Sequence, residues 1–96
     1  MKNKEISEKI FYEIRKISDK EKLTVDRDTN LIGTGSIFDS IKLVETCLYL
    51  ETLADELGFE FDWSSENALS RSRGMFRTAG SLADAFLEQL DQSKKP

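Results

Sequence analysis

Residues 6–17 hold the pattern that decides the fold, and they read ISEKIFYEIRKI. The isoleucines recur at steps of four, four and three residues: Ile6, Ile10, Ile14 and Ile17. An α-helix repeats about every 3.6 residues, so side chains at these steps lie on one face. The pattern therefore predicts an amphipathic helix of about four turns, ending near residue 18, that buries its isoleucine stripe.

Composition excludes several classes of function. The 96 residues suffice for one domain, and 39% apolar with 33% charged residues is typical of a folded one. The net charge of −4 argues against nucleic acid or an anionic membrane as the main partner, because both favour basic proteins. Histidine is absent and Cys47 is the only cysteine, which excludes Ser-His-Asp or Cys-His catalysis and structural zinc within the chain. We expect a cytoplasmic protein without a membrane span.

A second helix is predicted to be opened by Asp39-Ser40 and closed by Gly58. One face is apolar at helical spacing and should meet the core: Leu43, Cys47, Leu50, Ala54 and Leu57. Val44 lies beside this stripe. Ile41 and Leu48 fall roughly a third of a turn away, at about 100° per residue. The helix therefore carries a second apolar surface.

Two connections are too apolar to be free linkers. Residues 19–38 form a long connection with turn-forming residues, yet we expect an ordered loop because six apolar side chains should pack against the helices: Leu23, Val25, Leu31, Ile32, Ile37 and Phe38. Residues 59–63 alternate aromatic and acidic side chains, and we interpret them as an extended connector whose rings fill the core.

The C-terminal part completes an all-α domain with four helices. A short third helix is predicted to end near Ser70. The last helix is predicted to begin at Ser81, where Asp84 three residues on is close to a capping box. We assign residues 1–91 to one domain and residues 92–96 to a mobile polar tail.

Two partial ligand motifs fail for lack of their defining residues. Asp26, Asp28 and Asn30 alternate like calcium ligands, but aliphatic residues stand where an EF-hand needs its glycine and its glutamate. Gly33 and Gly35 lack the third glycine and the lysine of phosphate-binding loops. We interpret both stretches as turn-forming loops.

Arginines at positions 71, 73 and 77 alternate with Met75 and Phe76. Basic and aromatic side chains together are typical of nucleic acid or phosphate binding. In an acidic protein, solvated arginines paired with nearby carboxylates are the simpler interpretation. Recognition of a protein partner or of a phosphate is the alternative.

Ser40 is expected at the start of the second helix, where a serine is ordinarily an N-cap. The helix that it opens carries carboxylates beside the second apolar surface: Glu45, Glu51, Asp55 and Glu56. The helix dipole favours a phosphate at this end. Because no histidine is available as a base, this serine is suited to receive a phosphodiester and not to attack a substrate.

These residues resemble the attachment motif of the acyl carrier proteins and related peptidyl carrier domains. In that family Asp-Ser-Leu/Ile/Met opens the second of four helices, and Asp39-Ser40-Ile41 matches it. Glu45 stands where the family often has glutamate. Ile41 and Leu48 match apolar positions at which the family contacts its partners.

The resemblance extends over about residues 6–90, and the segment that begins at Ser81 looks like the family's Thr-Val-x-x-Leu opening of the last helix. It implies an acyl-carrier-like four-helix bundle, monomeric and not itself an enzyme. It also implies that a separate phosphopantetheinyl transferase attaches 4′-phosphopantetheine from coenzyme A to Ser40. The arm would present an acyl or aminoacyl group, as a thioester, to acyl-loading and acyl-transferring enzymes.

By the same resemblance, Ile41, Glu45 and Leu48 would contact the partner enzymes. We add Glu51 of the same helix, and Arg71 and Arg73 of the arginine stretch, as candidate partner contacts. Residues 39–62 hold seven acids against one base, Lys42, which suits partners with basic patches. Lys42 stands where fatty-acid carriers usually have an acid, and the arginine stretch is longer than theirs. These departures point to a specialised pathway of fatty acid or secondary metabolite biosynthesis. Two alternatives stay open: an aminoacyl or peptidyl carrier, and an unmodified helical adaptor.

Overall fold

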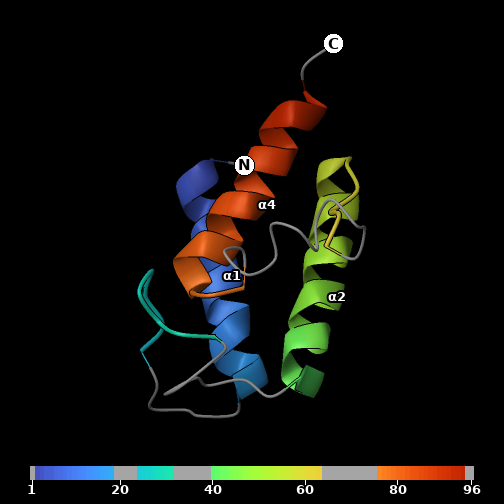
Figure 1. Cartoon of the computed structure of the whole chain (residues 1–96). Helices are drawn as coiled ribbons and strands as arrows, with labels where there is room; N and C mark the ends of the chain where they lie inside the picture. Colours follow the sequence, from blue (N-terminus) through green and yellow to red (C-terminus); the bar gives the residue numbers. More distant parts are fainter. Residues whose placement is uncertain (1, 19–23, 32–39, 64–75, 95–96) are drawn as a thin grey trace.

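The part of the chain that the structure describes is built from three helices (Figure 1). A computed structural model describes four stretches of the chain: residues 2–18, 24–31, 40–63 and 76–94. Their helices are α1 (Asn3–Ser18), α2 (Ser40–Leu57) and α4 (Ala79–Ser93). These stretches contain no strand, only an isolated antiparallel bridge between Asn30 and Thr78. The all-α prediction is confirmed to this extent.

Some predicted elements lie outside the described residues. The short third helix that was expected to end near Ser70 is one of them. Most of the long connection between α1 and α2 is another, since only its residues 24–31 are described. Within that stretch Leu31 is fully buried and Val25 is half-buried, as expected of an ordered loop.

α1 buries its isoleucine stripe, as predicted. Ile6, Ile10 and Ile14 are completely buried, and Ile17 in the last turn is half-buried. Burying one such side chain contributes about 1.5–3 kcal/mol, so the stripe is the main force that holds α1 in place. The helix ends at Ser18, whose hydroxyl donates a hydrogen bond to a carbonyl one turn back, at 2.6 Å.

The helices meet around Phe86 of α4. Figure 1 shows α1 running antiparallel to both α2 and α4, and each pair of helices is in contact. Phe59 and Phe61 place their ring centroids 5.1 Å and 5.4 Å from that of Phe86, which is fully buried. Trp63 also packs against this core. The predicted extended connector with core-filling aromatic rings is therefore confirmed.

α2 ends at Leu57 and is closed by Gly58, as predicted. This glycine has φ +87°, a left-handed conformation that side chains with a Cβ rarely adopt. The Gly58 amide donates to the Asp55 carbonyl at 3.1 Å, and the Phe59 amide donates to the Ala54 carbonyl at 2.9 Å. This Schellman arrangement satisfies carbonyls at the end of the helix and turns the chain towards the aromatic connector.

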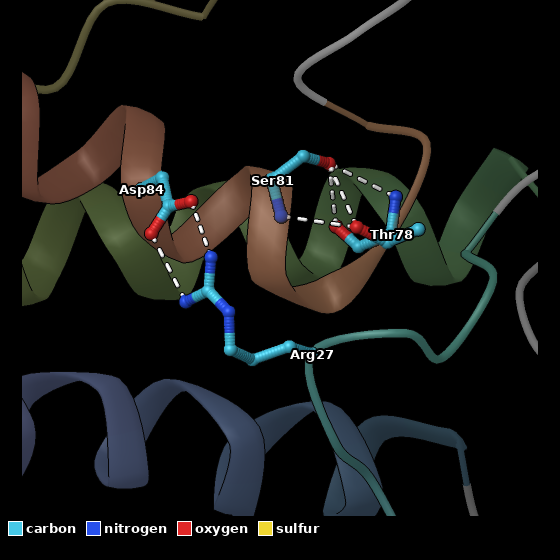
Figure 2. A network of polar contacts seen from close by, with 4 residues as sticks. All are labelled: Arg27, Thr78, Ser81 and Asp84. Carbon is cyan, nitrogen blue, oxygen red and sulfur yellow. Dashed lines mark hydrogen bonds and ion pairs between the residues drawn. The ribbon is translucent and has the colours of Figure 1, made fainter.

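α4 begins at Ala79, two residues earlier than the sequence predicted. Its N-cap is Thr78, whose hydroxyl accepts a hydrogen bond from the Ser81 amide at 3.0 Å. The Ser81 hydroxyl accepts one in return from the Thr78 amide at 3.0 Å (Figure 2). The capping box is therefore formed by Thr78 and Ser81, and the prediction that Ser81 opens the helix was wrong. At its other end α4 runs to Ser93, two residues into the predicted tail.

A clasp joins the loop of residues 26–31 to residues 77–84 at the start of α4. Three backbone hydrogen bonds of 2.9–3.0 Å build it: Leu31 N–H to Arg77 O, Ala79 N–H to Thr29 O, and Gly80 N–H to Arg27 O. The first amides of a helix lack partners within the helix. Here the loop carbonyls supply partners for two of them. The long connection is thus fixed to α4 at residues far from it in sequence.

Two further features tighten the clasp. A Cβ added to Gly80 would lie 2.7 Å from the Arg27 carbonyl oxygen, so this close approach requires glycine. The Arg27 guanidinium forms two hydrogen bonds to the Asp84 carboxylate, at 2.5 Å and 3.1 Å (Figure 2). Asp26 stabilises the loop from within, because its carboxylate accepts the Asp28 amide at 2.9 Å. The predicted turn role of Asp26 is confirmed.

Candidate functional site

Ser40 is the first residue of α2, as the sequence predicted. Its side chain, like the preceding Asp39, lies outside what the structure describes. The first turn of α2 contains no acidic residue. The N-terminal end of a helix carries partial positive charge, which favours a phosphate group there.

The exposed face of α2 is apolar along its middle. Ile41, Val44 and Leu48 are 71%, 44% and 51% exposed. At about 100° per residue they fall within about 60° of one another, so they form one stripe. The exposure of Ile41 and Leu48 agrees with the prediction from periodicity. Val44 was placed beside the buried stripe and instead belongs to the exposed one, because neither α1 nor α4 covers that flank.

Carboxylates flank the apolar stripe. Glu45, Glu51 and Asp55 are exposed and project from the same side of α2. We call these three acids together with Ile41, Val44 and Leu48 the exposed face of α2. An apolar stripe bordered by one sign of charge is suited to a partner with an apolar patch and basic residues around it.

The opposite face of α2 holds the bundle together. Cys47, Leu50 and Ala54 are buried, as predicted. Leu53 and Thr46 are also buried, although neither belongs to the predicted stripe. The Thr46 hydroxyl donates to the Lys42 carbonyl at 2.9 Å. This hydrogen bond satisfies the buried hydroxyl, so a polar side chain can occupy the interior. The spacing of apolar residues cannot predict such a position.

Lys42 faces α1, away from the exposed face of α2. Its ammonium donates a hydrogen bond to the Ser18 carbonyl at 3.1 Å, at the C-terminus of α1. A cation is favourable there, because the carbonyl end of a helix carries partial negative charge. The lysine that interrupts the acidic pattern in the sequence therefore links the two helices and does not divide the acidic surface.

The Cys47 thiol is poorly reactive because it is buried. Burial raises the pKa of its thiol from 9.0 to about 12, and the nearby Glu51 carboxylate adds to the effect. The thiolate is the reactive form of cysteine, and it is negligible at neutral pH with such a pKa. The prediction of a small buried residue is confirmed, and the chain's own sulfur is not a nucleophile.

The C-terminal end of the exposed face borders a cleft of about 300 Å³ lined by Glu51, Asp55, Phe59, Glu60 and Phe61. Trp63 lies next to it, and its indole N–H donates to the Glu51 carboxylate at 2.7 Å. The Gln89 side chain of α4 pairs with both backbone groups of Asp62, at 2.7 Å and 2.9 Å. The connector that forms this end of the face is therefore fixed to α4.

The remaining predicted partner residues, Arg71 and Arg73, lie outside the described residues, whereas Arg77 is described and exposed. No group of three metal-ligating side chains occurs in the described stretches. The alternating Asp26 and Asp28 form a turn there and do not gather as calcium ligands. In the same stretches no helix has the length and apolar content needed to cross a membrane.

Comparisons with known proteins identify no relative. No family model matches the chain, and neither the curated proteins nor the solved structures contain a match.

Proposed function

We propose that this protein is a carrier whose Ser40 receives 4′-phosphopantetheine from coenzyme A through a separate phosphopantetheinyl transferase. One observation carries the proposal. Ser40 opens the helix that bears three of the four exposed large apolar side chains in the described residues, bordered by carboxylates. A modifiable hydroxyl and a recognition surface on one helix are what a tethered carrier requires.

The start of α2 suits the group. The helix dipole points its positive end towards Ser40, the first residue of α2. Lys42 holds this turn against the end of α1 through Ser18, so the hydroxyl-bearing residue stands on a fixed element. The arm would supply a terminal thiol that holds an acyl or aminoacyl group as a thioester. The chain supplies attachment, presentation and docking, and it catalyses nothing itself.

We further propose that a short third helix lies between α2 and α4 in the sequence and completes a four-helix bundle. We also propose that the protein is a cytoplasmic monomer. Acyl-loading and acyl-transferring enzymes would dock on Ile41, Glu45, Leu48 and Glu51 of the exposed face. Tethering raises the effective concentration of the cargo at each of their active sites. An aminoacyl or peptidyl carrier uses the same arm and the same face.

The test is intact-mass measurement after incubation with coenzyme A and a broad-specificity phosphopantetheinyl transferase. We expect the wild-type chain to gain the mass of one phosphopantetheine group and Ser40→Ala to gain nothing. Ser7→Ala on α1 is the matched control, and it should gain the same mass as wild type. No gain in the wild type, or an equal gain in Ser40→Ala, would refute the proposal.

An unmodified helical adaptor is the second candidate, because the exposed stripe of Ile41, Val44 and Leu48 would serve it equally well. The two candidates differ in the role of Ser40. An adaptor keeps partner binding and cellular function in Ser40→Ala, whereas a carrier loses function while it stays folded. Complementation of a deletion strain with Ser40→Ala separates them.

A further inference from the structure

We infer that Lys42 is a positioning residue, which fixes the first turn of α2 and with it the backbone of Ser40. The inference rests on the proposed function of Ser40. Both residues belong to the first turn of α2. The Lys42 ammonium donates a hydrogen bond to the Ser18 carbonyl at the C-terminus of α1, at 3.1 Å. A contact between two helices thus begins at the side chain next but one to the proposed attachment residue.

The start of α2 lies outside the buried part of the helix. Across residues 41–45 no side chain is fully buried, and the buried part begins at Thr46. Ser40 therefore precedes the buried part by more than one helical turn. The ends of a helix fray most easily, because the first amides lack partners within the helix. The half-buried Leu43 packs against the core and the Lys42 ammonium bonds to α1, and both contacts oppose this fraying.

The acceptor of the Lys42 hydrogen bond is itself firmly held. Ser18 is 1% exposed, and its hydroxyl donates to the Arg15 carbonyl at 2.6 Å. About one turn back, the fully buried Ile14 fixes the end of α1 in the core. The carbonyl end of a helix carries partial negative charge, so an ammonium there gains a hydrogen bond and a favourable charge interaction. The bond therefore ties the exposed start of α2 to a buried point of α1.

Loss of the ammonium should loosen the first turn of α2 and leave the helices packed. The rest of α2 is held by its buried residues: Thr46, Cys47, Leu50, Leu53 and Ala54. A hydrogen bond to a charged group is strong enough to shift the equilibrium between the formed and the frayed first turn by about fivefold. Fewer molecules would then present Ser40 in its helical position. The apparent KM of the transferase for the carrier rises by the inverse of the competent fraction, and kcat stays unchanged.

The experiment compares Lys42→Met with wild type, using coenzyme A and the broad-specificity phosphopantetheinyl transferase. Methionine keeps an apolar stem of similar length and removes the ammonium. We expect the KM for the carrier to rise about two- to fivefold with kcat unchanged. Amide exchange should become faster at Val44 and Glu45, because these amides bond to carbonyls four residues back, in the first turn.

Two further variants serve as rescue and control. Arginine can still donate to the Ser18 carbonyl, so Lys42→Arg should keep both readouts close to wild type. Lys9→Met removes the same charge from an exposed site on α1, and it should behave as wild type.

The outcomes separate the two proposals. If the wild-type chain accepts no phosphopantetheine, the proposed function fails. If it is modified and Lys42→Met keeps the wild-type KM, or Lys42→Arg restores neither readout, the positioning role is wrong and the carrier function stands. A raised KM without faster exchange at Val44 and Glu45 would mean that Lys42 contacts the transferase directly, which also overturns the positioning role. Lys42→Gln decides the question in the same way if Lys42→Met loses helicity.

Discussion

The two apolar faces of α2 contain similar residues and are used differently. Cys47, Leu50 and Ala54 are enclosed by α1 and α4, whereas Ile41 and Leu48 meet solvent. Apolar content alone does not reveal which side is the core; the neighbouring helices decide it. The contrast separates stability from recognition within one helix, and three matched pairs of variants test it.

The largest effect is expected from truncating a leucine on each face. Leu50→Ala removes a fully buried side chain and leaves a cavity, so we expect it to lower the free energy of unfolding by about 2–5 kcal/mol. Leu48→Ala should change it by less than about 0.5 kcal/mol, because the side chain is half exposed. Urea denaturation followed by circular dichroism measures both. In the carrier proposal, Leu48→Ala slows transfer from the loaded arm, and a large loss of stability in that variant would place it in the core.

The second comparison places a thiol on each face of α2, and its effect is on how the free energy of unfolding depends on pH. The pKa of Cys47 is about 12 in the folded chain against an ordinary 9.0. Below pH 9 both states keep the proton and stability is unaffected. As pH rises from about 9 towards 12 the unfolded chain loses the proton first, so the free energy of unfolding falls by up to about 1.4 kcal/mol per pH unit.

Cys47→Ala should remove this slope, which alkaline urea titrations of the two proteins measure. A single thiol moved to the other face, in Cys47→Ala/Leu48→Cys, should ionise near the ordinary value and react with alkylating reagents at neutral pH. Rapid alkylation of Cys47 in the folded wild type would contradict the burial of this face.

The smallest effect compares two threonines. Thr46 is buried and its hydroxyl donates to the Lys42 carbonyl, whereas Thr52 is exposed and donates to the Leu48 carbonyl at 3.2 Å. We expect Thr46→Val to cost about 1 kcal/mol through the lost buried hydrogen bond. Thr52→Val should cost less than about 0.5 kcal/mol. Thermal unfolding of the pair checks this order, and equal shifts would mean that the two faces differ less than their exposure indicates.

The local patterns of the sequence were enough for α1 and most of α2. Isoleucines three and four residues apart lie on one face of an α-helix, so their spacing predicts α1. Gly58 marks the end of α2 because a residue in the left-handed conformation is needed there. Ile41 and Leu48, two predicted members of the candidate site, follow from the same periodicity. The start of α2 at Ser40 agrees with the predicted opening at Asp39-Ser40.

Contacts between distant segments could not be predicted in this way. Gly80 lies in the first turn of α4, although glycine is a poor helix former. Glycine is required at this position because the Arg27 carbonyl oxygen lies where a Cβ would clash with it. The pairing of Arg27 with Asp84, and of Lys42 with Ser18, depends on how the helices pack. Val44 lies between the buried stripe and the exposed stripe of α2. Its exposure therefore depends on where the other helices pack, which the sequence pattern does not show.

The hydrogen bond between Trp63 and Glu51 has an optical consequence. Trp63 is the only tryptophan of the chain, and its indole nitrogen lies 2.7 Å from a carboxylate of the exposed face of α2. Indole emission responds to charge and hydrogen bonding at that nitrogen. A partner whose basic group takes over the Glu51 carboxylate would change the emission of Trp63. The protein therefore carries its own fluorescent reporter at the edge of the surface on which we expect partners to bind.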